Sequence, residues 1–341
     1  MKRNSLIIRN LVFILFSTSI FISTGCNKPR QIKYKYGTFP DTAYNLDAIN
    51  TEYDDYNSDL DWVGTSFAII FSSNRTTSGG KFDFVTGALS FGFERYEGYF
   101  SIESDMIDDF FLTGLTEAAN TEGDDFGPFR FVSTLDAYEY FLYTSEGPGG
   151  DLDIMYLKYL PQLGSIIPDF GAPVPANILN SDSDDGYIAF DVSETRIFFN
   201  SDREGQFNIY TIEKPVSYNI DDWLALDPAT PVKIDSINSE YDDKCPIVSR
   251  NVMVFTSNRP GGMGGFDLYY SIYKDGKWGS PVNFGPTVNS DADEYRPILG
   301  YHPDFTNLFL VFSSNRSGGK GGYDLYFAGV DIPGEPTLIT K

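Results

Sequence analysis

The sequence is poor in cysteine, histidine and basic side chains, and each shortage argues against a class of protein. Two cysteines and one histidine in 341 residues leave no histidine-rich metal site and no obvious catalytic triad. Lys and Arg number 25 against 48 Asp and Glu, which gives a formal net charge of −23. Removing the three basic residues of segment 1–25 makes that charge −26. Such a surface repels phosphate backbones, so no nucleic-acid partner is expected.

Long apolar runs are also scarce. The segment Leu11–Ile22 has 12 apolar or small residues, whereas a membrane-spanning helix needs about 20. Behind a basic start, a run of this length is typical of a signal peptide. It ends in Ser-Thr-Gly before Cys26, which resembles the lipobox of bacterial lipoproteins. We therefore expect 1–25 to be the signal peptide, Cys26 to carry the lipid and 26–34 to form a tether. A plain secretory signal is the alternative.

The small number of cysteines is consistent with an exported protein that has no disulfide. If Cys26 is lipidated, Cys245 has no partner and is expected to be a small buried hydrophobe, while a Cys26–Cys245 disulfide is the alternative. The lipid would be the only membrane contact and would hold the protein at the bacterial outer membrane. No acidic run follows Cys26, which favours the periplasmic face over the cell surface.

One unit recurs five times along the chain. The clearest copies are FTSNRPGGMGGFDLYY at Phe255–Tyr270 and FSSNRSGGKGGYDLYF at Phe312–Phe327. Weaker copies occupy Phe71–Val85, Tyr143–Leu157 and Phe199–Ile212. The aligned serines lie 56 or 57 residues apart, except for a first step of 72. A period of this size predicts a repeat architecture.

Each unit predicts four short strands. In the fourth copy, two apolar runs precede a glycine-rich turn, an alternating strand at Phe266–Tyr273 and a short edge strand at Lys277–Phe284. Four strands per unit are typical of a propeller blade. The glycine cluster lacks the Lys-Ser/Thr of a phosphate-binding loop, so we interpret it as a tight hairpin.

The two ends of the chain predict a closed ring. The last copy lacks a fourth strand, whereas Lys35–Asp55 resembles the fourth strand and loop at Lys277–Glu294. We predict an all-β fold: a five-bladed β-propeller of four-stranded antiparallel blades over 35–330, in which an N-terminal strand completes the last blade. Residues 331–341 would form a tail. A sixth blade would need a hidden copy within Glu94–Ala119.

The best-preserved residues also carry a family resemblance. The pattern SNR-x-GG-x-GG-x-DLY, with G-x-W-x-x-P-V-N and N-S-x-x-D-E-x-x-P, spans Ser239–Phe327. It resembles the WD-repeat-like blades of TolB-type propellers, in particular those of Bacteroidota envelope proteins, including secretion components. The resemblance implies an envelope binding scaffold without an inherited activity.

Residues that recur in the blades are expected to serve the blade. Asp267 and Asp324 are predicted to accept hydrogen bonds from the backbone of the glycine-rich hairpin. The arginines of the SNR motif, such as Arg259 and Arg316, are predicted to hold carbonyls or a carboxylate.

Acidic pairs that precede the innermost strand of every blade form the candidate site. They should meet at one end of the central channel and make a negative funnel. Three interpretations are open: loop caps, a mouth that binds an envelope protein or basic peptide, or a Ca²⁺ site. No other cofactor is expected. The predicted partner-binding residues are Asp54, Asp55, Asp124, Asp125, Asp184, Asp185, Asp242, Asp243, Asp293 and Glu294.

These observations led to a functional expectation without catalysis. Glycoside hydrolysis requires carboxylates in unlike surroundings, and near-equivalent pairs in every blade argue against that asymmetry. We therefore expect a non-catalytic lipoprotein that acts as a protein-interaction scaffold through the acidic funnel, in an outer-membrane or secretion-associated complex. The alternatives are a glycan-binding protein or a five-bladed glycoside hydrolase.

Overall fold

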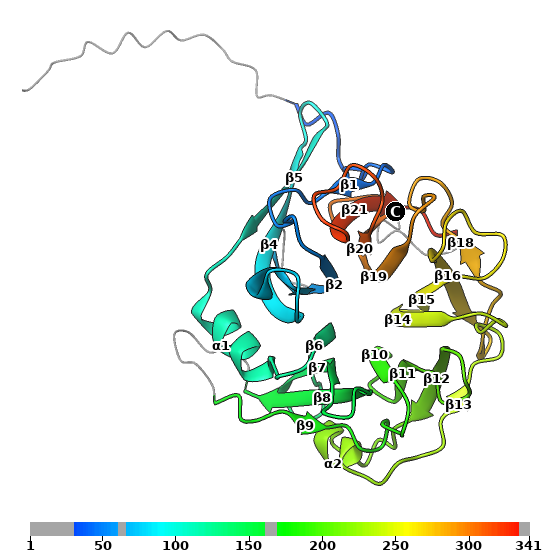
Figure 1. Cartoon of the computed structure of the whole chain (residues 1–341). Coiled ribbons are helices and arrows are strands. Elements are labelled where there is room, and N and C mark those ends of the chain that lie inside the picture. The colour runs from blue at the N-terminus through cyan, green and yellow to red at the C-terminus, as the bar shows by residue number, and fades with distance from the viewer. Residues whose placement is uncertain (1–30, 61–65, 161–168, 334–341) are drawn as a thin grey trace, which may run out of the picture.

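The computed structural model describes residues 31–60, 66–160 and 169–333. Their strands form five antiparallel sheets arranged around a central axis, with the innermost strands β2, β6, β10, β14 and β19 facing the middle of the ring (Figure 1). The expected signal peptide and Cys26 lie outside the described residues. Within the described part, no helix has the length and hydropathy needed to cross a membrane.

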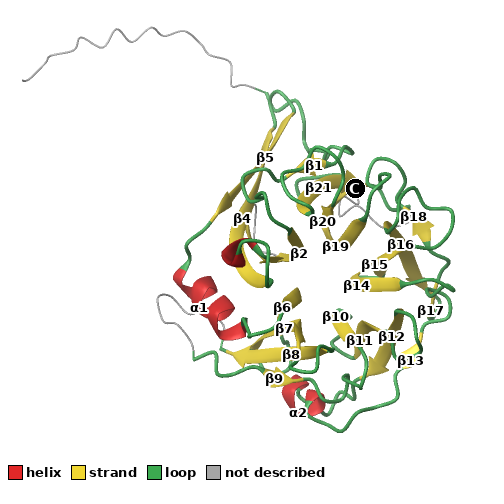
Figure 2. Cartoon of the chain, viewed as in Figure 1, coloured by secondary structure: helices red, strands yellow, loops and turns green. Residues whose placement is uncertain are grey.

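Each blade runs from the axis to the rim through four strand positions, and the outermost position of the fourth blade holds two short strands (Figure 2). The first blade holds β2 (Asp55–Leu60), β3 (Ser66–Ser73), β4 (Asp83–Glu94) and β5 (Tyr99–Met106). The second holds β6 (Asp125–Val132), β7 (Glu139–Glu146), β8 (Leu152–Tyr159) and β9 (Val174–Pro175). The third holds β10 (Asp185–Phe190), β11 (Arg196–Ser201), β12 (Asn208–Glu213) and β13 (Val232–Lys233). The fourth holds β14 (Asp243–Ser249), β15 (Val252–Ser257), β16 (Asp267–Lys274), β17 (Lys277–Trp278) and β18 (Val282–Asn283).

The fifth blade joins the two ends of the described chain, as predicted. It holds β19 (Glu294–Gly300), β20 (Leu308–Ser314), β21 (Asp324–Val330) and the N-terminal strand β1 (Tyr44–Asn45). β1 pairs antiparallel with β21, so a strand from each end of the described chain shares one sheet. Phe39 adds a second tie, because its ring stacks on Phe305 with centroids 3.8 Å apart. The five-bladed propeller and its closure are therefore confirmed.

The extra length between the first two copies forms no sixth blade. It lengthens the β4–β5 hairpin and adds helix α1 (Phe110–Ala119). Asp109 caps this helix, since its carboxylate accepts hydrogen bonds from the backbone of Phe111 and Leu112, both at 3.0 Å. The buried face of α1 covers a core between the first two blades. A shorter helix, α2 (Ile220–Leu224), lies between β12 and β13.

The hydrophobic core lies between neighbouring blades rather than within one layer. Side chains of β7 and β8 pack against those of β10, β11 and α2, and a separate cluster joins the third and fourth blades. Because strand side chains alternate between faces, each sheet presents one apolar set to each neighbour. The five sheets are thus held as a ring by their facing surfaces.

Every innermost strand carries a one-residue bulge at the same place. In β2, Tyr56 pairs with Ser72 and Asp59 pairs with Ile70, so β2 has one more residue than its partner between these pairs. The same shift occurs in β6, β10, β14 and β19. The second residue after each acidic pair has positive φ at this point. These residues are Asn57, Gly127, Tyr187, Cys245 and Arg296.

The glycine-rich hairpins are tight for two reasons. Gly261 and Gly318 have φ near +90°, as a tight turn requires. Gly264 does not have positive φ, but a Cβ placed there would lie 1.8 Å from the carbonyl oxygen of Ala292. The hairpin of the fourth blade therefore rests directly on the acidic loop of the fifth.

Candidate functional site

The acidic pairs belong to a six-residue pattern, Asn-Ser/Thr-x-x-Asp-Asp/Glu, that occurs once per blade. The copies start at Asn50, Asn120, Asn180, Asn238 and Asn289. All five lie at the start of an innermost strand and contact the preceding blade. We call them the inter-blade belt.

The asparagines of the belt act as substitutes for strand backbone. Asn238 accepts a hydrogen bond from the backbone N–H of Ile209 at 2.7 Å and donates one to its carbonyl at 2.8 Å. Asn289 brackets Leu268 in the same way, at 2.8 and 3.0 Å. The other three asparagines make the same pair of bonds to Leu325, Phe84 and Ile154. Each blade is thus joined to its predecessor by two matched hydrogen bonds.

The first carboxylate of each pair also reaches the preceding blade. Asp293 accepts a hydrogen bond from the backbone of Phe266 at 2.8 Å, and Asp54 accepts one from Tyr323 at 2.7 Å. Asp124, Asp184 and Asp242 hold Phe82, Leu152 and Phe207 in the same way. One oxygen of every first carboxylate is therefore engaged by the blade-to-blade contact.

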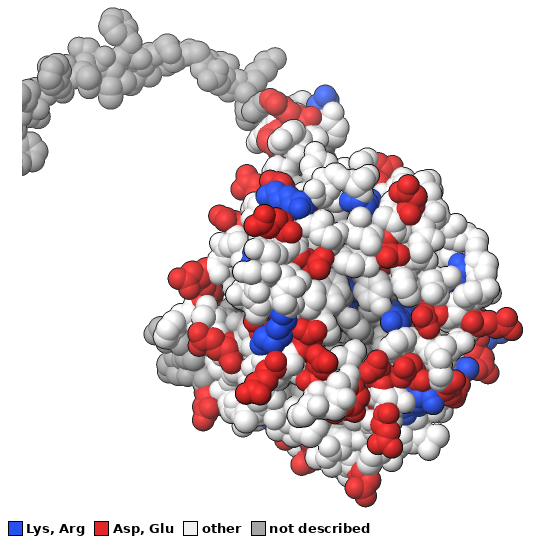
Figure 3. Space-filling view, in the orientation of Figure 1, with Lys and Arg blue, Asp and Glu red and all other residues white. Residues whose placement is uncertain are grey.

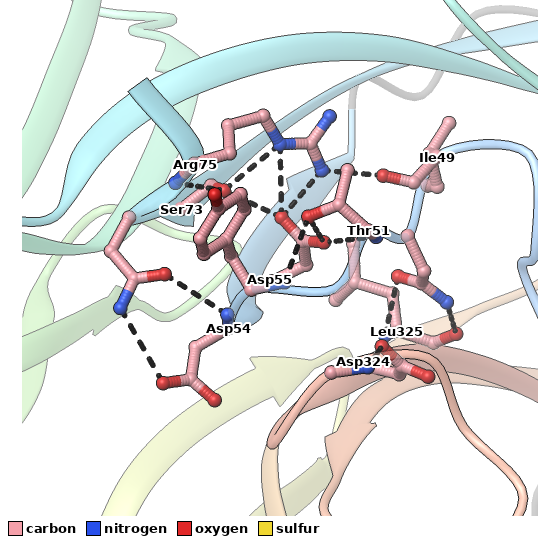
Figure 4. A network of polar contacts seen from close by, with 12 residues as sticks. Ile49, Thr51, Asp54, Asp55, Ser73, Arg75, Asp324 and Leu325 are labelled. Atoms are coloured by element: carbon pink, nitrogen blue, oxygen red, sulfur yellow. Dashed lines mark hydrogen bonds and ion pairs between the residues drawn. The ribbon is translucent and has the colours of Figure 1, made fainter. Parts of the chain in front are cut away.

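The second carboxylate is fully buried and is held within its own blade. Figure 4 shows Asp55 between Thr51, Ser73 and Arg75. Asp185 accepts from the backbone and hydroxyl of Ser181, both at 2.7 Å, and pairs with Arg203 at 2.6 Å. Asp243 and Glu294 are held in the same way, and Asp267 and Asp324 accept hydrogen bonds from the hairpin backbone. The predicted roles of the recurring arginines and hairpin aspartates are confirmed.

The second blade lacks this arginine, and the pKa of its buried carboxylate is raised. Its equivalent position is Gly147, and the carbonyl of Ala119 instead accepts a hydrogen bond from the hydroxyl of Tyr143 at 2.8 Å. Burial raises the pKa of Asp125 to about 6, against the lowering effect of its hydrogen bonds from Thr121 and Ser145. A buried carboxylate without a cation is therefore harder to ionise.

The ten predicted partner-binding residues are thus brought to one end of the channel, where hydrogen bonds of the propeller occupy them. Acidic side chains are spread over the whole face seen in Figure 3, with few basic ones among them. In the described ranges no group of three His, Cys, Asp or Glu side chains is placed to hold a metal ion. Binding of a partner by these carboxylates stays a prediction.

A cavity lies at the other end of the innermost strands. It has a volume of about 570 Å³ and is lined by the last residues of β2, β6, β10, β14 and β19. We call it the lower cavity. Phe129, Phe190 and Ile298 supply apolar walls. Its charged lining residues are Asp59, Arg130, Glu139, Asp191, Glu194 and Arg250.

Asp59 is the most strongly perturbed carboxyl of the lower cavity. Its side chain is buried, and one oxygen accepts hydrogen bonds from the backbone and Nε of Arg130 at 3.1 and 3.2 Å. Burial nevertheless raises its pKa to about 6, because desolvation outweighs the attraction of Arg130 and Arg296. Burial therefore favours the protonated form of Asp59, whereas the ion pair with Arg130 at 3.2 Å favours the carboxylate.

Asp191 lies in the same cavity under opposite conditions. Burial acts to raise its pKa, but hydrogen bonds from Arg196, Ser193 and Thr195 outweigh burial and lower it. Asp191 is therefore an ionised carboxylate with a fixed orientation. Glu194 has another role, since it accepts three hydrogen bonds of 2.7 Å from Ser133 and Thr134 and joins two loops.

The sequence did not reveal this group because its members do not repeat. Asp59 follows the bulge of the first blade, and the equivalent residues Phe129, Ala189, Ile247 and Ile298 are apolar. The available signal was this exception: an aspartate stands alone at a position where four blades carry apolar residues.

Comparisons with known proteins identify the architecture. No family model matches the sequence, and no curated protein matches it. A thermostable family-43 glycoside hydrolase is similar in structure, with 13% identity, a TM-score of 0.52 and coverage of 86% of this chain and 98% of that one. An α-L-arabinofuranosidase from Podospora anserina, solved with cellotriose, has 12% identity, a TM-score of 0.49 and coverage of 89% and 98%. A levansucrase from B. megaterium has 9% identity, a TM-score of 0.49 and coverage of 91% of each chain.

These matches correct the functional expectation. The chain was expected to be a non-catalytic protein-interaction scaffold, yet the solved structure that it resembles at a TM-score of 0.52 is a glycoside hydrolase. The expectation rested on the near-equivalence of the acidic pairs, whereas the carboxylates of the lower cavity do not repeat from blade to blade. The likeness itself shows the five-bladed fold, and the argument for a function depends on the lower cavity.

Proposed function

We propose that this protein binds a glycan in the lower cavity and hydrolyses a glycosidic bond there. The observation that carries the proposal is one cavity with two carboxyl groups whose pKa values are displaced in opposite directions. Glycoside hydrolysis uses such a pair: a carboxylic acid that stays protonated and a carboxylate that stays ionised. Asp59, with its pKa of about 6, fits the first role, and Asp191, with its lowered pKa, fits the second.

The reaction follows from these two states. Asp59 donates its proton to the glycosidic oxygen as the bond to the anomeric carbon breaks, and the leaving sugar departs as an alcohol. Asp191 stabilises the positive charge that develops on the sugar ring. Its oxygens are held by Ser193, Thr195 and Arg196, so it acts as a fixed charge. Water then adds to the anomeric carbon, and its proton returns to Asp59.

The walls of the lower cavity suit a sugar. Its volume of about 570 Å³ lies within the range of about 300–1,000 Å³ typical of small-molecule sites. Val132, Val192 and Tyr301 line it and are exposed at its rim. The guanidinium of Arg250 lies 4.5 Å from the centre of the Tyr301 ring. Apolar surface beside a few polar groups is the usual composition of a ligand pocket.

The test is a panel of chromogenic aryl glycosides and plant polysaccharides, with Asp59→Asn as the key variant. Asparagine keeps the size of the side chain and an acceptor for Arg130 but has no proton to donate. We expect kcat to fall by about 10²–10⁴-fold, the usual contribution of general acid catalysis. Asp182→Asn is the matched control, because Asp182 is exposed in the loop before β10 at the other end of the channel.

The pH profile adds a second readout. Activity of the wild-type protein should decline as pH rises above about 6, when Asp59 loses its proton. Unchanged activity in Asp59→Asn would rule out the assignment. Saturable sugar binding without a hydrolysis product would favour the alternative function, a glycan-binding protein.

We further propose that the protein is a lipoprotein of the bacterial outer membrane with its propeller in the periplasm. This proposal rests on the lipobox-like sequence before Cys26 and on the resemblance of the C-terminal repeats to TolB-type envelope propellers. Cys26→Ala should move the protein from the membrane fraction to the soluble fraction. An unchanged distribution between the fractions would contradict the lipid anchor.

A further inference from the structure

The upper end of the channel, where the inter-blade belt lies, is lined by aromatic side chains. They come from the residue after the acidic pair in three blades and from the residue held by the first carboxylate in four. Tyr56 stacks on Tyr323 with ring centroids 5.4 Å apart, and Tyr295 meets Phe266 at 5.4 Å. Phe82 and Phe126 extend the same collar, with centroids 5.3 Å apart. This set of side chains is the aromatic collar.

The collar is interrupted at the third blade. Gly186 stands where the other blades carry Tyr56, Phe126, Lys244 or Tyr295. A Cβ at Gly186 would lie 2.5 Å from the hydroxyl of Thr144, so the packing of the second blade requires glycine here. The missing side chain leaves a cavity of about 180 Å³, which we call the upper notch.

The upper notch contains one ammonium group and apolar walls. Lys244 lines it, together with Phe126, Leu152, Phe207 and Tyr295. Its Nζ lies 3.6 Å from the centre of the Phe207 ring. Among the described residues the side-chain ammonium of Lys244 makes neither an ion pair nor a hydrogen bond, although it has three protons to donate. Burial lowers its pKa, against the raising effect of the nearby carboxylates.

The charges around Lys244 restrict which ligand group can bind its ammonium. Asp184 lines the same notch, and Asp242 and Asp202 lie close enough to influence the pKa of the ammonium. Their negative charges disfavour a doubly charged group such as phosphate. A single carboxylate can accept from the ammonium at a lower electrostatic cost. The notch is smaller than typical drug-sized pockets of about 300–1,000 Å³, so it fits one small ring.

We propose that the upper notch is a second saccharide site, which binds the carboxylate of one uronic acid residue through Lys244 and packs the sugar ring against Tyr295. The site lies at the opposite end of the innermost strands from the lower cavity. It therefore does not depend on the hydrolysis proposal.

The test uses the full-length chain purified in detergent, with ligand-observed NMR and calorimetric titration. The probes are D-glucuronate and D-galacturonate, each compared with glucose and galactose at equal ionic strength. We expect the uronates to bind at least tenfold more tightly than the neutral sugars. Lys244→Met, which keeps an apolar stem over Phe207, should weaken uronate binding at least tenfold. Lys277→Met is the matched control, because Lys277 is exposed in β17.

A second measurement uses the wild-type protein alone. Glucuronate should slow the acetylation of Lys244 by an N-hydroxysuccinimide ester, followed by mass spectrometry, and leave Lys277 unchanged. Equal affinity for glucose and glucuronate, or equal acetylation with and without ligand, would overturn the proposal. Asp59→Asn should retain uronate binding while it loses hydrolysis, so the two proposals fail or succeed separately.

Discussion

Rebuilding the arginine contact in the second blade should remove the pH dependence contributed by Asp125. In the other four blades, the arginine bridges the second carboxylate and the carbonyl six residues before it, as Arg203 does with Asp185 and Leu179 at 2.6 and 2.9 Å. The double variant Tyr143→Phe/Gly147→Arg supplies the guanidinium and frees the Ala119 carbonyl. A Cβ at Gly147 would meet only ordinary contacts, the nearest at 3.6 Å, so the side chain can be accommodated.

The size of the effect follows from the pKa of Asp125. Its pKa rises from 3.8 to about 6 on folding, and each unit corresponds to about 1.4 kcal/mol. A carboxyl whose folded pKa is raised contributes stability below the unfolded pKa, and this contribution is lost as pH rises through the folded value. The wild-type protein should therefore lose about 3 kcal/mol through this group between pH 4 and pH 7. The variant should keep that free energy, and ordering and desolvating the new arginine should cost about 1–2 kcal/mol at every pH.

The assay is urea denaturation of both proteins at pH 4, 5, 6 and 7. The free energy of unfolding of the variant relative to wild type should rise by about 2–3 kcal/mol from pH 4 to pH 7. In an Asp125→Asn background the same double change should show no such rise. Parallel stability curves for variant and wild type would refute the reasoning, because they would mean that the buried carboxyl titrates normally without its cation.

Three further outcomes follow from single residues. Asn50→Ala removes both hydrogen bonds to Leu325 that join the two ends of the described chain. Thermal denaturation should show that the free energy of unfolding falls by about 2–3 kcal/mol. A decrease below about 0.5 kcal/mol would contradict the role of the belt. Cys245 is fully buried with its pKa raised to about 12 by burial, so an alkylating reagent at pH 8 should modify it only in urea, as mass spectrometry would record. Asp109→Ala should cost about 1 kcal/mol in a urea titration through loss of the α1 cap, and Asp109→Asn should restore most of it.

Repetition in the sequence explains what could be predicted. The glycine-rich hairpins and the SNR arginines recur at fixed spacing, and their structural contacts were predicted because one explanation had to fit several copies. The N-terminal strand could be paired with the last blade because Lys35–Asp55 resembles a segment that follows a complete copy. The asparagines of the belt could have been predicted from the same pattern, since Asn238 and Asn289 stand at equal distances along the sequence from the acidic pairs.

The candidate site escaped prediction for the opposite reason. Asp59, Glu139 and Asp191 occupy unlike positions in three blades, so no comparison between copies brings them together. Their proximity depends on how five strands end around one axis. The pKa of Asp59 depends on burial by neighbouring blades, which local sequence does not express. In the sequence, the near-equivalent pairs argue against the asymmetry that glycoside hydrolysis requires, and nothing singles out an unrepeated carboxylate such as Glu139.

The bulge shared by the five innermost strands separates the channel into two independent halves. Before Asn57, Tyr187 and their counterparts, the asparagine and the acidic pair of each blade recur and hold the preceding blade. After the bulge the residues do not repeat from blade to blade, and each blade contributes a different side chain to the lower cavity. Substitutions there should change what the propeller binds without loosening its ring. A single fold of this kind can therefore be adapted to new ligands by altering only the last few residues of five strands.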